Sequence, residues 1–179
     1  ASFVLNPGGE LAVQMPQFLP SVTHVDFVET EGGWRAQKGL MDSLPRIVEA
    51  DYHAMVMGTR DYLAKCGFKK VLLGLSGGID SAIVATIAAD AIGAENVRCV
   101  MLPSRFTSEV SLQDAGEVAR NLGCRLDTVS IAGSQEAVGD ALEGLFAGTE
   151  PGVTEENIQS RLRGVLLMCA AMLAFVVND

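Results

Sequence analysis

Apolar positions between residues 71 and 146 alternate between two kinds of segment. Short apolar runs, each about as long as a buried strand, are followed by longer stretches in which apolar residues recur every three to four positions. The short runs predict strands over 71–75, 97–102 and 126–131. The longer stretches predict helices over 80–92, 111–122 and 134–146, the second of them capped by Ser111. Strands that alternate with helices across short links form a parallel sheet flanked by helices, so the pattern indicates the α/β class.

The residues before this region follow a different pattern. Two apolar runs flank the sequence Asn6-Pro7-Gly8-Gly9, which predicts a β-hairpin as an N-terminal appendage. Residues 18–39 show little periodicity and predict a polar loop, whereas a helical stripe predicts a helix from about Pro45 to Cys66. This change of composition predicts a domain boundary near residue 40, with a hairpin and linker over 1–39 and the α/β domain over 40–179.

The last part of the chain predicts a loop over 147–153 and a final helix capped by Thr154. The apolar run from Val165 to Val177 is too short to span a bilayer comfortably and predicts a buried helix, so no membrane segment is expected. A net charge of −9 argues against binding to nucleic acid or to an anionic membrane, although it leaves room for a local anion site. The four cysteines form no CxxC pair, which favours buried free thiols in a reducing cytoplasm over a zinc site.

Residues 74–81 read GLSGGIDS and lie where the first predicted strand meets its helix. Ligands of parallel α/β sheets bind beyond the carboxyl ends of the strands, which is where this stretch lies. Glycines let the main chain approach a ligand closely, and the helix start offers unpaired N–H groups and the positive end of its dipole. Ser76 and Ser81 add hydroxyl donors. The stretch therefore predicts a cradle for phosphate or pyrophosphate.

Asp80 is unusual in such a cradle, because a carboxylate repels phosphate unless a cation lies between them. Mg²⁺ resolves the conflict, since it binds one or two carboxylates together with phosphates and water. The alternative is that Asp80 only caps the helix, but this leaves Ser76-Gly77-Gly78 unexplained. No lysine precedes Ser81, so the loop is not a Walker A loop, and no GxGxxG motif accompanies it.

The SGGIDS motif resembles the PP-loop of the ATP pyrophosphatases, the adenine-nucleotide α-hydrolase-like group. Two further stretches, LPSRFTSEVSLQDAGEVARNLGC (102–124) and TEENIQSRLRGVLLM (154–168), resemble segments of the NAD synthetase family. Upstream, SFVLNPGGELAVQMPQF resembles the last hairpin of the nitrilase-like glutaminase domain that precedes the synthetase domain in the glutamine-dependent members. The resemblance covers nearly the whole chain.

The resemblance implies a carbon–nitrogen ligase of NAD biosynthesis. ATP would adenylate the nicotinate carboxylate of deamido-NAD and release pyrophosphate, and ammonia derived from glutamine would then displace AMP. It implies an ATP and pyrophosphate site formed by Gly74, Leu75, Ser76, Gly77, Gly78, Ile79, Asp80, Ser81 and Met101. Asp80 would bind Mg²⁺, and Asn157 and Arg161 match positions that contact deamido-NAD. Since deamido-NAD sites of the family lie between subunits, the full-length enzyme is expected to be a homo-oligomer.

The sequence also departs from the family pattern. After RLRGVLLM the family continues through a glycine-containing loop with a second magnesium ligand, whereas this sequence reads CAAMLAFVVND. The body of the glutaminase domain has no counterpart either, so a fragment of the enzyme is expected. No catalytic residue is assigned. Two alternatives stay open: another PP-loop enzyme, such as an amidotransferase or a tRNA-modifying enzyme, and a non-catalytic module that binds adenine nucleotides. Exposed pairing with Glu155 or Glu156 is an alternative role for Arg161 and Arg163.

Overall fold

The computed structural model describes residues 2–146, 148 and 152–176. The chain divides into two compact units, Ala1–Gly58 and Thr59–Asp179, which we call the hairpin unit and the sheet unit and treat separately. Residues just after the predicted boundary at 40 belong to the hairpin unit, because the Gln14 N–H donates to the Leu40 carbonyl and the Asp42 N–H donates to Gln14. The division into a domain of residues 1–39 and one of residues 40–179 stays a prediction.

The hairpin unit begins with the predicted β-hairpin. Strands β1 (Phe3–Leu5) and β2 (Leu11–Gln14) pair antiparallel, with Val4 opposite Val13. The Asn6 N–H closes the turn by donating to the Glu10 carbonyl at 2.8 Å. The prediction of a hairpin at this position is therefore confirmed.

The predicted polar loop over 18–39 is wrong, because part of it forms a second hairpin. Strands β3 (Phe27–Thr30) and β4 (Gly33–Ala36) pair antiparallel from Phe27 opposite Ala36 to Thr30 opposite Gly33. Seven of these eight strand residues are exposed or only partly buried. The hairpin therefore has no buried face that would require apolar and polar residues to alternate in the sequence.

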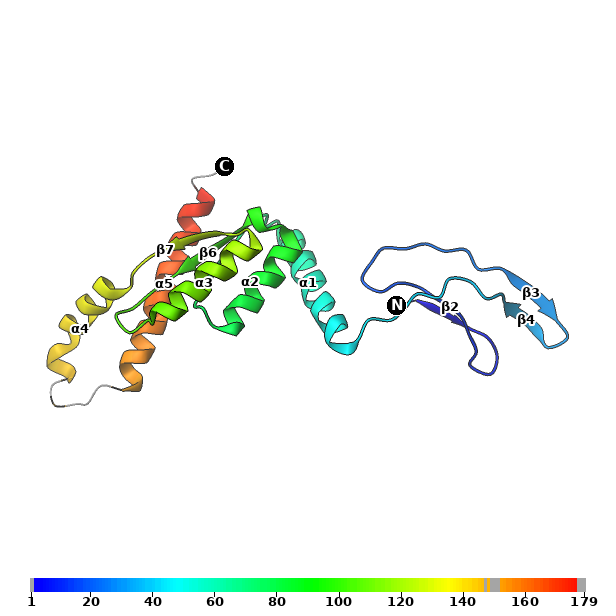
Figure 1. The fold of residues 1–179 in the computed structure, drawn as a ribbon, viewed down its shortest axis with the longest axis horizontal. Coiled ribbons are helices and arrows are strands. Elements are labelled where there is room, and N and C mark those ends of the chain that lie inside the picture. Colours follow the sequence, from blue (N-terminus) through cyan, green and yellow to red (C-terminus); the bar gives the residue numbers. More distant parts are fainter. Residues whose placement is uncertain (1, 147, 149–151, 177–179) are drawn as a thin grey trace. The chain divides into compact units, whose positions relative to one another are not determined.

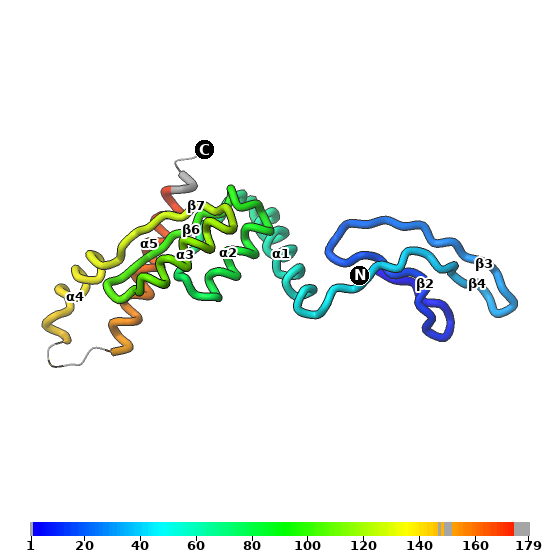
Figure 2. The backbone as a smooth tube through the Cα atoms, in the orientation of Figure 1, coloured from blue at the N-terminus to red at the C-terminus, as the bar shows by residue number. Residues whose placement is uncertain are grey.

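Helix α1 (Ile47–Cys66) confirms the helix predicted from about Pro45 (Figure 1). The sheet unit follows with three parallel strands in the order β5-β6-β7: β5 (Val71–Gly74), β6 (Val97–Met101) and β7 (Arg125–Thr128). Helices join and follow the strands: α2 (Ile79–Ile92), α3 (Glu109–Leu122), α4 (Ala132–Phe146) and α5 (Val153–Val176), with a 3₁₀ turn η1 over Ala94–Asn96. The path of the chain confirms the predicted parallel α/β architecture (Figure 2).

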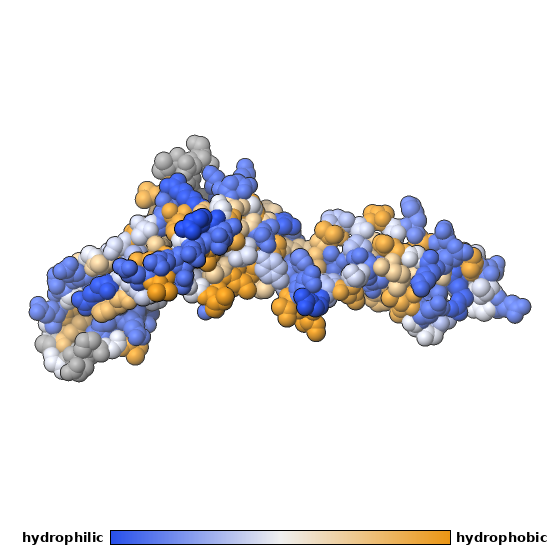
Figure 3. All heavy atoms as spheres, viewed as in Figure 1, coloured by the Kyte–Doolittle hydropathy of each residue, from blue (hydrophilic) through white to orange (hydrophobic). Residues whose placement is uncertain are grey.

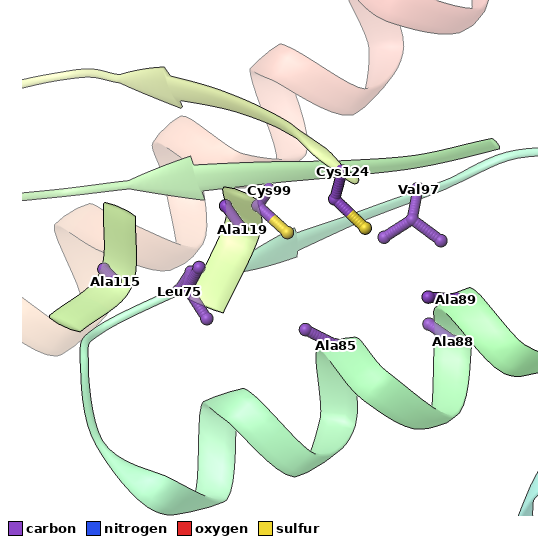
Figure 4. Packing of buried hydrophobic residues seen from close by; sticks show 9 residues of the cluster. All are labelled: Leu75, Ala85, Ala88, Ala89, Val97, Cys99, Ala115, Ala119 and Cys124. Carbon is purple, nitrogen blue, oxygen red and sulfur yellow. The ribbon is translucent and has the colours of Figure 1, made fainter. Parts of the chain in front are cut away.

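The sheet separates two hydrophobic clusters. The cluster on the side of α2 and α3 consists mainly of small side chains, and Figure 4 shows those of α2 pointing at the strands; its buried members are Leu75, Ala85, Ala88, Ala89, Val97, Cys99, Ala115, Ala119 and Cys124. On the other side, Val100, Leu102 and Ile131 are buried with Leu166 and Leu167 of α5 packed against them. The small alanines let α2 and α3 approach the strands closely, which fixes the start of each helix at the carboxyl end of the sheet.

Two predicted helix starts are wrong by a few residues. Helix α3 begins at Glu109 and is capped by Ser108, whose Oγ accepts the Ser111 N–H, so Ser111 is the donor in the cap. Helix α5 begins at Val153, and the Glu155 carboxylate accepts the Gly152 N–H, which lowers the pKa of Glu155. Most of the predicted loop over 147–153 lies outside the described residues.

The apolar run in α5 is only half buried. Leu166 and Leu167 pack against the sheet, whereas Val165, Met168 and Met172 are between 56% and 67% exposed. The prediction of a buried helix is therefore wrong for one face of α5, and residues 174–177 of the run lie outside the described side chains. Among the described residues, no helix is both long enough and apolar enough to cross a bilayer.

The cysteines divide into two pairs. Cys99 and Cys124 are buried free thiols, as predicted, and burial together with the neighbouring Cys124 raises the pKa of Cys99 to about 11. The prediction is wrong for Cys66 and Cys169, which are exposed because they lie in the last turn of α1 and on the exposed face of α5.

Candidate phosphate-binding site

The loop between β5 and α2 is a sharp bend of main chain. The Leu75 N–H donates to the Val100 carbonyl of β6 at 2.9 Å, which extends the sheet by one residue before the chain turns. Gly77 then adopts a φ of +80° and lies so close to α3 that a Cβ there would meet the Ser111 backbone, with 2.9 Å to its Cα. Only glycine fits this position, because a side chain is both strained at that φ and blocked by main chain.

The hydroxyl groups of Ser76 and Ser81 hold the bend in shape. Ser81 Oγ donates to the Gly78 carbonyl at 2.9 Å and accepts the Ser76 N–H at 3.1 Å. Ser76 Oγ lies 3.0 Å from Ser81 Oγ and accepts the Gly78 N–H at 3.3 Å. Since Ser81 uses its hydrogen on Gly78, Ser76 is the donor between the two hydroxyls. Both hydroxyls thus bond within the loop, and their predicted role as donors to a ligand stays a prediction.

The start of α2 has no side-chain cap. Its N-cap residue is Gly78, which makes no capping hydrogen bond, so the first N–H groups of the helix keep no side-chain acceptor. Asp80 lies inside the first turn, so the alternative that Asp80 is the N-cap is wrong. Its side chain is exposed and makes no hydrogen bond or ion pair with the described residues, which leaves both carboxylate oxygens available to a cation.

A cavity of about 500 Å³ adjoins this bend. Its walls come from the end of β5, the end of β6 with the following loop, the start of α3, and α5. The lining residues are Gly74, Leu75, Ser76, Val100, Met101, Leu102, Pro103, Phe106, Thr107, Ser108, Ser111, Arg163 and Leu167. The N-cap of α3 is thus part of the wall, and the bend that leads into α2 is another part. The N-terminus of α3 therefore borders the cavity and favours an anion within it, while the start of α2 follows the lining residue Ser76 a few positions along the chain.

Several predicted site residues meet at this cavity, and others lie elsewhere. Gly74, Leu75, Ser76 and Met101 line it, while Gly77, Gly78, Ile79, Asp80 and Ser81 continue the same bend outside the lining. Ile79 is 81% exposed. Asn157 and Arg161 are exposed on α5 and do not line the cavity; the Asn157 amide donates to the Val153 carbonyl of its own helix. Their predicted contacts with deamido-NAD stay a prediction.

Arg163 is the site residue that sequence reasoning missed. It lies two positions after Arg161 and is partly buried. Its Nε–H donates to the Leu102 carbonyl at a distance of 3.2 Å, and both residues line the cavity. The alternative of exposed pairing with Glu155 or Glu156 is wrong for Arg163. The available signal was its spacing, because Arg163, Leu166 and Leu167 fall on one helical face.

Arg105 belongs to a neighbouring cavity. Its guanidinium lies 4.7 Å from the centre of the Phe106 ring, and Phe106 lines the first cavity. Arg105 itself lines a second cavity of about 500 Å³ with residues of α4 and α5, among them Gln135 and Asp140. Arg105 is therefore not part of the wall of the phosphate cradle.

The parallel sheet and the glycine bend at its carboxyl edge define an α/β domain with the fold of the PP-loop class. The chain belongs to the NAD synthase family, whose model matches residues 51–177.

Known relatives agree with this assignment. The chain is 61% identical to the glutamine-dependent NAD(+) synthetase of Rhodobacter capsulatus over 168 residues, which is 94% of this chain and 30% of that protein. It resembles the structure of the glutamine-dependent NAD+ synthetase from Acinetobacter baumannii in complex with ADP, with a TM-score of 0.89, 38% identity, and coverage of 94% of this chain and 32% of that one. The chain thus spans about 30% of the length of the curated relatives it matches.

A shorter relative matches less of the chain. The NH3-dependent NAD synthetase from Campylobacter jejuni, solved with a nitrate ion, has a TM-score of 0.59 and 27% identity. Its match covers 68% of this chain and 51% of that one. The glutamine-dependent relatives therefore share more of the chain with this protein than the NH3-dependent one does.

Proposed function

We propose that the chain supplies the ATP site of an enzyme that amidates the nicotinate carboxylate of deamido-NAD to give NAD. The observation that carries this proposal is the bend at Gly77. There the main chain after β5 lies directly against the Ser111 backbone at the start of α3, and it continues into the uncapped start of α2. Such an arrangement suits a polyphosphate, because the uncapped start of α2 offers main-chain N–H groups and the N-terminus of α3 lies in the wall of the adjoining cavity.

The cavity suits the rest of the nucleotide. In this proposal the phosphates of ATP bind along residues 74–81 and the adenosine lies near Met101 and the loop after β6. Apolar walls from Val100, Pro103 and Phe106 fit a base, and the ADP complex of the A. baumannii relative supports a nucleotide as the ligand.

A magnesium ion fits the residues present. Asp80 offers a carboxylate without a partner among the described residues, and no group of three His, Cys, Asp or Glu side chains suited to a metal occurs among them. The ion would therefore take its other ligands from phosphate and water, which is usual for Mg²⁺. Bound there, it would offset negative charge on the phosphates as pyrophosphate departs.

The chemistry needs positioning more than a nucleophilic side chain. The nicotinate carboxylate attacks the α-phosphate of ATP, pyrophosphate leaves, and ammonia then attacks the acyl-adenylate to release AMP. The loop and the two helix starts hold the phosphate chain in place, so that the attacking carboxylate meets a fixed phosphorus atom. Asn157 and Arg161 would orient deamido-NAD from the exposed face of α5, which is consistent with a site completed by a second copy of the protein.

We infer that ammonia comes from glutamine. Glutamine-dependent relatives such as those of Rhodobacter capsulatus and Xylella fastidiosa match 94% to 96% of this chain, although two others match only 72% and 73%. The NH3-dependent structure matches 68%, a share close to that of the sheet unit alone. The hairpin unit is then the end of a glutamine-hydrolysing domain that lies in the longer parent protein. The proposed substrates, ATP, deamido-NAD and glutamine, and the free cysteines are both consistent with a cytoplasmic enzyme.

The metal role is tested by replacing Asp80 with alanine and measuring ATP binding by calorimetry with and without Mg²⁺. We expect binding to weaken at least about tenfold with the metal and to change little without it, because a charged contact of about 1.5 to 3 kcal/mol is lost. Asp61→Ala is the matched control, since Asp61 is an exposed acid on α1 of the same unit. An equal loss in both conditions would contradict the metal role, and no ATP binding by the unmodified protein would contradict the proposed function.

The reaction is tested by AMP release in the parent enzyme. We expect AMP and pyrophosphate to form only when deamido-NAD and a nitrogen source are present. AMP release with a nucleobase or tRNA substrate instead would indicate another PP-loop enzyme, and ATP binding with no AMP release on any substrate would indicate a nucleotide-binding module.

A further inference from the structure

Arg163 differs from the other arginines whose contacts the structure describes. Arg163 is partly buried and lines the cavity, and its hydrogen bond to a neighbour runs from Nε to the Leu102 carbonyl. Within the described ranges of the chain, no carboxylate lies within ion-pair distance of it. Two NH₂ groups therefore have no protein partner among these residues, on a side chain that lines the cavity.

The other arginines show what usually satisfies such a group here. Arg35 pairs with Glu10 at 2.6 Å, and Arg98 pairs with Asp127 at 2.5 Å. Arg60 forms no ion pair with the residues that the structure describes, but it donates to the carbonyls of Asp90 and Ala91 at the negative end of the α2 dipole. The Leu102 carbonyl lies just past a strand, where no helix dipole adds to it.

A charged side chain that is partly buried without a counter-charge is available to an anion that enters the cavity, because no carboxylate among the described residues competes for it. Arg163 also stands in the same wall as Ser108 and Ser111, where the α3 N-terminus already favours an anion. The Nε bond to Leu102 holds the plane of the guanidinium, so its remaining N–H groups are directed as a pair, the arrangement that binds phosphate oxygens in bidentate fashion.

We propose that Arg163 is a phosphate-binding residue of this site and supplies the counter-charge for the polyphosphate chain of ATP. The inference rests on the proposed function and adds a residue to it. The cradle of residues 74–81 then contacts the chain through main-chain N–H groups, while Arg163 contacts it from α5 with a positive side chain. In this proposal, α5 contacts the bound nucleotide through Arg163.

The test compares the unmodified protein with Arg163→Met and Arg163→Lys, using calorimetric titration with ATP and with adenosine in Mg²⁺. We expect Arg163→Met to bind ATP about 10- to 100-fold more weakly, as expected for the loss of hydrogen bonds to a charged group. Adenosine binding should stay within about twofold of the unmodified protein, because adenosine has no phosphate. Arg163→Lys should fall between the two, since it keeps the charge but loses the fixed pair of donors. Arg120→Met is the matched control, an exposed arginine in the last turn of α3.

The outcomes separate this inference from the proposed function. If the unmodified protein binds no ATP, the proposed function fails. If it binds ATP and Arg163→Met binds it within about twofold, the inference fails while the proposed function stands. An equal loss of ATP and adenosine binding, accompanied by a lower thermal midpoint, would show that Arg163 only supports the end of β6 and would also overturn the inference.

Discussion

The hairpin unit and the sheet unit are stabilised in different ways. In the sheet unit, two buried clusters of apolar side chains lie on opposite faces of three strands. In the hairpin unit, a buried amide connects one hairpin to the other: Asn6 Oδ1 accepts the Ala36 N–H at 2.8 Å and Asn6 Nδ2 donates to the Ala36 carbonyl at 3.0 Å. An exposed ion pair between Arg35 and Glu10 adds a second link.

Both units leave large apolar side chains exposed, but they differ in what they bury: among the described residues, the buried apolar side chains of the hairpin unit are only Ala12, Val13, Ala36 and Val56. In the hairpin unit Val22 is 92% exposed, Trp34 63% and Phe3 58%, and Figure 3 shows apolar residues at the surface of this unit. A unit that leaves such side chains in water gains little hydrophobic stabilisation from its own fold. The sheet unit therefore has two buried clusters that can hold the bend at Gly77 in place, whereas the hairpin unit depends more on hydrogen bonds such as those of Asn6.

The largest effect is expected in the sheet unit at Gly77. Gly77→Ala should cost about 3 kcal/mol of unfolding free energy, because alanine is strained at a φ of +80° and its Cβ meets the Ser111 backbone. ATP binding should fall below detection, since the bend must open to relieve the clash. Urea denaturation and calorimetric titration measure the two effects.

Gly116→Ala is the control for Gly77→Ala. Gly116 lies within α3, and a Cβ there would meet nothing within 4 Å. This change should leave ATP binding intact and raise stability by up to about 1 kcal/mol through helix propensity. If Gly77→Ala behaved like Gly116→Ala, the bend would not depend on the close approach of main chain.

A smaller effect is expected in the hairpin unit at Asn6. Asn6→Ala should destabilise that unit by about 2 kcal/mol, because it leaves the Ala36 N–H and carbonyl buried without partners. Amide hydrogen exchange should accelerate around Ala36 while the core strand β6 keeps its protection. Asn6→Asp keeps the acceptor for the Ala36 N–H but sets a carboxylate oxygen against the Ala36 carbonyl in a buried site, so it should destabilise the unit at least as much. Equal acceleration of exchange in both units would contradict the contrast between them.

The sequence predicted the sheet unit well, for a physical reason. Side chains pack on both faces of its sheet and on one face of its helices. Burial therefore produces short apolar runs in the strands and a three-to-four-residue apolar repeat in the helices. The glycine bend was equally readable, since at Gly77 close contact with main chain excludes every other residue type. Each of these features appears in the residue types themselves, even at Gly77, whose contact with Ser111 joins distant parts of the sequence.

The errors share the opposite cause. The hairpin over 27–36 leaves most of its residues exposed, so nothing forces its sequence to alternate. Arg163 meets Leu102 from 61 positions away, and no local pattern reveals that contact. The sequence predicted the start of α3 at Ser111, because Ser108 and Ser111 are both residue types that cap helices. The structure identifies Ser108 as the cap, since its Oγ accepts the Ser111 N–H.

The smallest predicted effect compares one ion pair from each unit. Asp127 in the sheet unit lies between Arg98 and Arg125, and the hydrogen bond from Arg98 is the main reason that its pKa is below the ordinary 3.8. Asp127→Asn should cost up to about 1 kcal/mol at neutral pH. Glu10→Gln in the hairpin unit should cost less, because both partners there are more exposed.

The pH dependence distinguishes the two pairs. Since the folded state lowers the pKa of Asp127, the unfolded state binds more protons just below the ordinary value, and stability rises with pH through that window. The contribution of Asp127 is thus complete above about pH 5 and declines as the pH falls through and below 3.8, where the unmodified protein and Asp127→Asn should converge. Urea denaturation at a series of pH values measures this. A gap between the two proteins that stays constant down to about pH 2 would mean that the carboxylate charge contributes nothing, and that the link between β6 and β7 depends on main-chain pairing alone.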